Sequence, residues 1–199
     1  MPARRRGGGE RRRARKRTAS RPWWLLVLAV VIVGGLIAAR LLRGPGSLPH
    51  RPPAEATVEV FFVRYTGSAE TGSLVAVHRT VPSGGSAARI TSAVRALLAG
   101  PSAEERREGL VSEVPRGTSL RRLEVAGGTA TVDLTGSFAQ GGGSTSMLAR
   151  VWQLVYTATQ TPDVRAVQIM IDGRRVRALG GEGVMVDAPI ERPATMPAF

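Results

Sequence analysis

The sequence contains no cysteine, which excludes disulfide bonds, thiolate metal sites and lipidation of a cysteine side chain. Its two histidines, His50 and His78, leave little material for a catalytic triad or a histidine-ligated metal. Lysine is almost absent, because Lys16 is the only lysine among the 28 basic residues. What the chain has in excess is positive charge, with a formal net charge of +13, so the placement of that charge decides which partners are expected.

The positive charge is concentrated at the start of the chain. Residues 1–21 contain ten Lys or Arg and one acid, Glu10, which gives +9 of the total +13. Residues 57–187 contain fourteen Arg and twelve acids, so this part is close to neutral. A nucleic-acid-binding domain carries its basic surface on the folded part. We therefore expect no nucleic-acid partner and interpret residues 1–21 as a disordered basic tail.

A long uncharged run follows the tail. No charged residue occurs from position 22 to 39, and as a helix this run is about 27 Å long. Leu41 and Leu42 extend it toward the roughly 30 Å of a bilayer's hydrocarbon core if the next arginine snorkels. The pattern predicts a transmembrane anchor over residues 22–42. The residues expected at its two interfaces are Arg21, Trp23, Trp24 and Arg40.

The basic tail also predicts the orientation of this anchor. Ten basic residues precede the span and few follow it closely, so the positive-inside rule places the N-terminus in the cytoplasm and the C-terminal domain outside the cell membrane. The tail is also expected to attract anionic lipids. A cleavable signal peptide is the alternative, but the apolar run is longer than usual and Ile37 occupies the small-residue position of the nearest cleavage site.

The rest of the chain divides by composition. Residues 43–56 are rich in proline and glycine, which predicts a semi-extended spacer, and residues 188–199 form a Pro-rich tail of the same character. Between them, residues 57–187 have the size of one domain with its own core.

The domain alternates pairs of strands with single helices. β-branched and aromatic runs predict strands over residues 57–64, 73–81, 120–125, 129–135, 164–171 and 174–178. Apolar residues at helical spacing predict one helix that follows Ser86 as a candidate cap and stops at Gly100-Pro101, and a second over residues 144–161. The order β-β-α-β-β-α-β-β predicts an α+β domain in which two helices pack on one face of a mostly antiparallel sheet.

The same residues resemble the GerMN domain, a family known from sporulation and germination proteins and from bacterial envelope lipoproteins. The resemblance covers nearly all of residues 58–187. Its motifs are LVAVHRTV with Arg79, ALLAGPSAEE with Gly100-Pro101, SEVPRGTSL with Pro115, Gly117 and Thr118, ATVDLTGSF with Asp133 and Phe138, and QLVYTATQTPDVRAVQIMIDGRRV with Gln153, Thr157, Asp172 and Gly173. The resemblance implies an extracytoplasmic, membrane-tethered module for assembly or binding, with a fold similar to ring-forming domains of envelope complexes.

Residue patterns for chemistry are weak. His78 lies on a predicted strand and is the one domain histidine that a Ser-His-Asp triad could use. Asp133, Asp163 and Asp172 follow no metal-ligand spacing, and Asp133 is expected on the outward face of its strand. The glycines before Ser86 and Ser144 lack the lysine of a P-loop. We therefore expect no metal, no cofactor and no enzyme activity.

Three functions remain to be compared. The favoured one is docking of another envelope protein, or of a second copy, through sheet edges or through the helix that carries Trp152 and Tyr156. The alternative is a module that binds a cell-wall polymer or small anion through Arg121-Arg122 or Arg174-Arg175. An envelope hydrolase using His78 is the least favoured.

Overall fold

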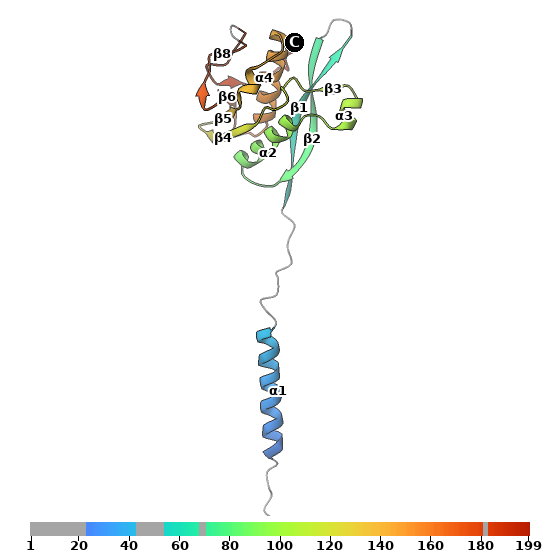
Figure 1. Cartoon of the computed structure of the whole chain (residues 1–199), viewed down its shortest axis with the longest axis vertical. Coiled ribbons are helices and arrows are strands. Elements are labelled where there is room, and N and C mark those ends of the chain that lie inside the picture. The colour runs from blue at the N-terminus through green and yellow to red at the C-terminus, as the bar shows by residue number, and fades with distance from the viewer. Residues whose placement is uncertain (1–22, 43–53, 68–70, 181–182) are drawn as a thin grey trace, which may run out of the picture. The chain divides into compact units, whose positions relative to one another are not determined.

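The computed structural model describes residues 23–42, 54–67, 71–180 and 183–199, and it divides into two compact units (Figure 1). One unit contains helix α1, and the other, which starts at Arg51, contains every strand in the described part of the chain. The basic tail with Arg21, and most of the spacer predicted over 43–56, lie outside the described residues.

Helix α1 (Trp23–Leu42) coincides with the predicted anchor of residues 22–42. Trp23 and Trp24 are 77% and 60% exposed, and apolar side chains such as Leu26 and Val30 are exposed along the helix. By length and apolarity taken together, however, no helix among the described residues qualifies as one that could cross a membrane. The transmembrane helix is therefore not confirmed.

A long hairpin opens the second unit. Strands β1 (Glu55–Thr66) and β2 (Thr71–Pro82) pair antiparallel over twelve residue pairs, from Glu55↔Pro82 to Thr66↔Thr71. The domain thus begins at Glu55, two residues inside the predicted spacer, because Glu55 and Ala56 complete the ladder with β2. Strand β3 (Leu110–Val111) adds to the far end of β1, which gives the order β2-β1-β3.

A second sheet is built from the remaining long strands. β4 (Leu120–Ala126) and β5 (Thr129–Leu134) form a hairpin, and β6 (Ala166–Ile171) lies between β5 and β10 (Ile190–Glu191), with β7 (Arg174–Arg175) folding back on β6. The turn η1 (Gly136–Ala139) and helix α4 (Ser144–Ala158) connect β5 to β6, so these two strands run parallel, as a helical crossover requires. In the described residues the predicted single, mostly antiparallel sheet is therefore divided into these two sheets, of which the second is mixed, and a third, two-stranded sheet of β8 (Ala178–Leu179) and β9 (Val184–Met185).

The predicted α+β single domain is confirmed, but the helices lie differently from the prediction. Helices α2 (Ser86–Ala99) and α4 (Ser144–Ala158) pack against each other, and both contact β1 as well as the second sheet (Figure 1). One core joins the two sheets through these helices. Its fully buried members include Val60, Phe62, Ile90, Leu97, Val132, Leu154, Val155 and Ile169. Because α4 has neighbours on most sides, its buried residues surround it rather than form one stripe.

The open edge of β1 is closed by two side chains of α4, Gln153 and Thr157, and by Gln160 just past the end of the helix. Gln160 exchanges two hydrogen bonds of 2.8 Å with the backbone of Glu59, donating through Nε2 and accepting through Oε1. Two residues further along β1, the Phe61 amide donates to Thr157 Oγ1 (3.2 Å), and Gln153 Nε2 donates to the Phe61 carbonyl (3.0 Å). Gln153 Oε1 also accepts from the Glu113 amide (2.8 Å). These three side chains, which we call the α4 ladder, take the place of a neighbouring strand.

Helix α3 (Ala103–Arg107) is fixed to the outer hairpin by one ion pair. Ser102 and Glu105 form a reciprocal capping box at its start. Both carboxylate oxygens of Glu105 accept from the Arg79 guanidinium at 2.6 Å. This bidentate bond lowers the pKa of Glu105, and burial opposes the shift. Arg79 also lies over the Phe62 ring, 5.9 Å from its centroid, so the pair connects α3 to β1 and β2.

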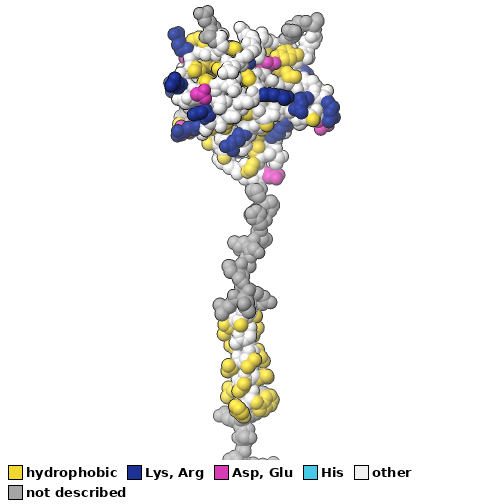
Figure 2. All heavy atoms as spheres, viewed as in Figure 1, with side chains coloured by type: hydrophobic (Ala, Val, Ile, Leu, Met, Phe, Trp, Pro, Cys, Tyr) yellow, Lys and Arg dark blue, Asp and Glu magenta, His cyan; other side chains and the backbone are white. Residues whose placement is uncertain are grey.

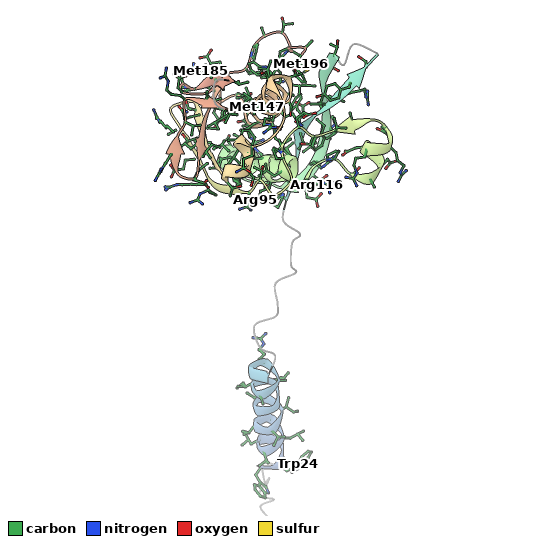
Figure 3. The ribbon with its side chains drawn as sticks, turned by 45° about the horizontal axis from the view of Figure 1, so that its top comes forward. Trp24, Arg95, Arg116, Met147, Met185 and Met196 are labelled. Carbon is green, nitrogen blue, oxygen red and sulfur yellow. The ribbon has the colours of Figure 1, made fainter. Side chains whose placement is uncertain are left out.

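The C-terminal residues belong to the domain, in contrast to the Pro-rich tail predicted over 188–199. Ile190 and Glu191 pair with β6 as β10. Phe199 exchanges two backbone hydrogen bonds with Gly72, of 2.6 and 3.2 Å. The short β8–β9 hairpin (Ala178–Leu179 and Val184–Met185) also packs on α4, because its Gly180 leaves room for the side chain of Met147, labelled in Figure 3. The high proline content of residues 188–199 therefore led to a wrong prediction for this segment. Proline lacks an N–H donor, but it keeps a carbonyl that can accept hydrogen bonds.

We predict that the Gln153→Leu substitution lowers the free energy of unfolding by about 2–4 kcal/mol, because the Phe61 carbonyl and the Glu113 amide would both lose their partner inside the protein. Urea unfolding measures this change. The matched control is Gln140→Leu, at an exposed position, for which we expect a change within about 0.5 kcal/mol. Equal effects of the two substitutions would contradict a supporting role for the α4 ladder.

Candidate functional site

The two aromatic residues proposed for docking, Trp152 and Tyr156, are exposed to different degrees. Tyr156 is only 2% exposed, and Trp152 is half-buried with its ring 6.4 Å from that of Tyr156. The Tyr156 hydroxyl donates to the carbonyls of Pro193 (3.2 Å) and Thr195 (3.3 Å), and Arg192 lies over its ring at 4.4 Å. The C-terminal segment therefore covers Tyr156, whereas docking through the half-buried Trp152 stays a prediction.

The four arginines proposed for polymer or anion binding lie on the second sheet. The register aligns Arg122, Asp133, Met170 and Arg175 across strands β4, β5, β6 and β7. Carboxylates offset much of this positive charge. Arg122 is paired with Glu124, and Arg121 lies 3.3 Å from Asp133 and 3.7 Å from Asp172, whereas Arg174 and Arg175 are exposed. In Figure 2 the basic side chains are likewise scattered over the visible face.

Asp133 lies on the outward face of β5, as expected, but it is not open to solvent there. It is only 8% exposed, because the turn after β6 and the side chain of Arg121 cover it. Its Oδ1 accepts from the Gly173 amide (2.9 Å) in the turn between β6 and β7, while Oδ2 accepts from Arg121. That turn places Asp172 at φ 48° and Gly173 at φ 77°, a left-handed pair that favours the Asp-Gly dipeptide. Asp133 therefore fixes a hairpin turn.

The other residues considered for chemistry are also accounted for by structure. His78 has a side chain that is 69% exposed, and its Nε2 lies 4.0 Å from Glu59 Oε1, with no serine hydroxyl bonded to it. Within the described residues, no three His, Asp or Glu side chains gather as a metal site would require. Ser86 and Ser144 are not caps, because Gly85 and Gly143 hold the capping positions without a side-chain bond.

A buried arginine organises the start of α4 and was not anticipated from the sequence. Arg150 is 2% exposed and donates to the carbonyls of Phe138, Gln140 and Gly141 at 2.8–2.9 Å, and to Ser146 Oγ at 3.1 Å. Burial lowers its pKa, and the Glu113 carboxylate opposes that shift. Arg150 thereby holds the glycine-rich loop before α4, and only its position on a helix otherwise lined with apolar residues distinguished it in the sequence.

The outer edge of β2 is the described feature best suited to contact another chain. β2 is the terminal strand of its sheet and pairs with β1 alone. Gly72 turns its amide and carbonyl outward, where both bond to Phe199. By the alternation of an antiparallel strand, Leu74, Ala76, His78 and Thr80 turn theirs outward too. We call this row, from Leu74 to Thr80, the β2 edge; the side chains of Ala76, His78 and Thr80 on it are exposed.

Several solved structures have a fold similar to that of this chain. The first covers tandem GerMN domains of the sporulation protein GerM from Bacillus subtilis, with a TM-score of 0.56 at 19% identity over 76% of this chain and 51% of that one. The chain thus spans about half the length of that structure. The first GerMN domain of the same protein gives a TM-score of 0.53 at 20% identity, over 69% and 98% of the two chains. A putative lipoprotein from Clostridium perfringens gives 0.50 at 18% identity, over 73% and 93%.

These similarities define the chain as a GerMN-type α+β protein. The sequence model of the Germane family, described as sporulation and spore germination, matches residues 59–177, and the chain belongs to this family. The family resemblance noted in the sequence is thereby confirmed. No curated protein matches the chain.

We predict that Tyr156→Phe loosens the C-terminal segment, because the carbonyls of Pro193 and Thr195 would lose a hydrogen bond of about 1 kcal/mol. Amide hydrogen exchange read by mass spectrometry should be about fivefold faster in peptides covering residues 190–199. Peptides from α2 serve as the internal control and should keep their exchange rates. Unchanged exchange in the C-terminal peptides would show that Tyr156 does not hold them.

Proposed function

We propose that this GerMN-type domain acts in the assembly of a bacterial envelope complex by docking another protein, without catalysis. The observation that carries the proposal is the uncovered β2 edge, whose outward amides and carbonyls can pair with an added strand. Exposed strand edges are normally shortened, charged or covered, because they attract other chains. Here one edge of the hairpin is closed by the α4 ladder, while the opposite edge is left open.

Membership of a family linked to sporulation and spore germination supports a role in the cell envelope. The protein neighbours named above belong to a sporulation protein and a putative lipoprotein, which agrees with an extracytoplasmic setting. Binding of a partner by strand addition needs no residue chemistry beyond the backbone. This fits the side chains of the β2 edge. Among them only His78 is suited to acid–base chemistry, and its Nε2 lies 4.0 Å from Glu59 Oε1.

The alternative function, binding of a cell-wall polymer or small anion, would use the arginines of the second sheet. All four arginines are exposed, but Arg121 and Arg122 already face carboxylates, which leaves Arg174 and Arg175 as the better candidates. Charge reversal at Arg174 and Arg175 should abolish retention on isolated cell walls if this alternative holds. Under the docking proposal the same double variant keeps its partner.

We predict that Ala76→Pro weakens partner capture by about tenfold, because proline removes an outward amide at the centre of the β2 edge and its ring obstructs an added strand. In-cell crosslinking of the tagged full-length protein, followed by quantification of the co-purified envelope protein, measures this. The ladder with β1 uses the amides of odd-numbered residues, so the thermal unfolding midpoint should change little. The matched control is Arg174→Glu, and equal losses in both variants would contradict docking at the β2 edge.

Attachment to a membrane through residues 22–42, with the N-terminus in the cytoplasm and the domain outside, is the second part of the proposal. Its support is the uncharged run from 22 to 39 and the exposed apolar side chains along α1, which need a cover. Against it stands the finding that no described helix qualifies as a membrane span. The basic tail of residues 1–21 would add attraction to anionic lipids.

We predict that the full-length protein sediments with membranes and resists alkaline carbonate extraction, and that deletion of residues 22–42 transfers it to the supernatant. If the cell wall is first removed and the cell membrane is kept intact, added protease should digest the domain and leave an N-terminal tag undigested. Extraction by carbonate would contradict a spanning helix, and extraction by high salt alone would show that only the basic tail binds lipid.

A further inference from the structure

A cleft of about 730 Å³ lies where the β1–β2 hairpin, the segment after β3 and the start of α4 meet. Its volume is within the range of small-molecule sites, about 300–1,000 Å³. Three kinds of group line it: one carboxylate, two aromatic rings and a series of hydroxyls. They are Glu113, Tyr65, Phe199, Thr71, Ser144, Thr145 and Ser146, together with Gly143.

The carboxylate is held in place from several directions. Glu113 Oε1 accepts from the Tyr65 hydroxyl at 2.8 Å, and Oε2 accepts from Ser146 Oγ at 2.5 Å. Ser146 Oγ in turn accepts from the buried Arg150, and the Glu113 amide donates to Gln153. A carboxylate accepts about four hydrogen bonds, so the lone pairs left over are fixed acceptors for a ligand. The acceptor is therefore pre-organised and needs no rearrangement on binding.

Two aromatic rings border this acceptor and meet on a glycine. A Cβ atom added to Gly72 would lie 2.5 Å from Phe199 Cε2 and 3.0 Å from Tyr65 Cε1, so both rings rest against the bare backbone of β2. Tyr65 is 37% exposed and Phe199 is half-buried, and both rings belong to the lining of the cleft. Aromatic rings in this position offer a flat apolar surface with a polar rim.

Donors complete the lining. No side chain caps α4, whose first internal bond is from the Met147 amide to the Gly143 carbonyl, so the first-turn amides lack a capping partner. The hydroxyls of Ser144 and Thr145 beside them are exposed and can donate or accept. The cleft thus pairs a fixed acceptor with several donors, and both face the aromatic surface.

We propose that this cleft binds a neutral carbohydrate. A sugar ring presents vicinal hydroxyls, which donate and accept at once, and an apolar face of C–H groups, which matches the aromatic surface. An anion at the α4 start would be repelled by Glu113, and a wholly apolar ligand would leave the hydroxyl groups without partners. Glu113 is the one side-chain carboxylate among the described residues of the lining, whereas glycoside hydrolysis uses a pair. This inference goes beyond protein docking, because the cleft and the β2 edge are formed by different groups.

The test is calorimetric titration of the full-length protein in detergent micelles with N-acetylated chitotetraose, a neutral glycan, and separately with inorganic phosphate. We expect saturable binding of the glycan and none of phosphate. Glu113→Gln should weaken glycan binding about tenfold, the loss of one hydrogen bond to a charged acceptor. The matched control is Glu108→Gln, an exposed glutamate outside the cleft, which should bind as the unaltered protein does.

Because Glu113 also bonds to Tyr65 and Ser146, a second pair of variants keeps the test independent of its structural role. Thr145→Tyr fills the cleft from an exposed position and should abolish binding, whereas Thr57→Tyr, the same change at an exposed threonine outside the lining, should leave it within about twofold. Ala76→Pro should bind the glycan normally, which separates this proposal from docking at the β2 edge. Absence of glycan binding, binding unaltered by Thr145→Tyr, or tighter binding of phosphate would each overturn the proposal.

Discussion

The fold depends on a strand edge that is closed by a helix. On the edge of β1 that faces away from β2, the backbone of Glu59 and Phe61 pairs with Thr157 and Gln153 of α4 and with Gln160 just past its end. Buried backbone groups without partners cost about 1–3 kcal/mol each, so this edge could not be buried without the α4 ladder. The ladder also fixes the position of α4 relative to the hairpin, and α4 in turn connects β5 to β6. One set of amide and hydroxyl groups thereby joins the two sheets into a single domain.

Local structure could be predicted from the sequence because its causes are local. The alternation in Thr129–Leu134, the glycines after β4 and the Asp172-Gly173 turn each specify their element within a few residues, and the structure contains all three. Contacts between distant segments could not be predicted. Gln153 and Thr157 are one turn apart on a helix, but nothing nearby in the sequence indicates that their partner is Phe61, more than 90 positions away.

The errors about the candidate sites have the same origin. Tyr156 carried the pattern of an aromatic residue that is either buried or used for binding, and only the return of residues 190–199 decides between the two. Asp133 alternates to the outward face of β5, but the β6–β7 turn folds over it. The cleft residue Glu113 went unnoticed although it lies in the SEVPRGTSL motif, because a lone glutamate after a two-residue strand indicates no particular chemistry. Its importance arises from the tertiary contacts with Ser146 and Tyr65.

The backbone pairing of Phe199 with Gly72 has a geometric consequence. It occupies the first outward-facing position of β2, so a strand added from outside cannot slide past Leu74 toward the hairpin loop. Because side chains on a strand alternate between faces, a fixed end point also determines which side chains of the incoming strand face the domain. The closing residues of the domain would therefore act as a stop that sets the register of an incoming strand.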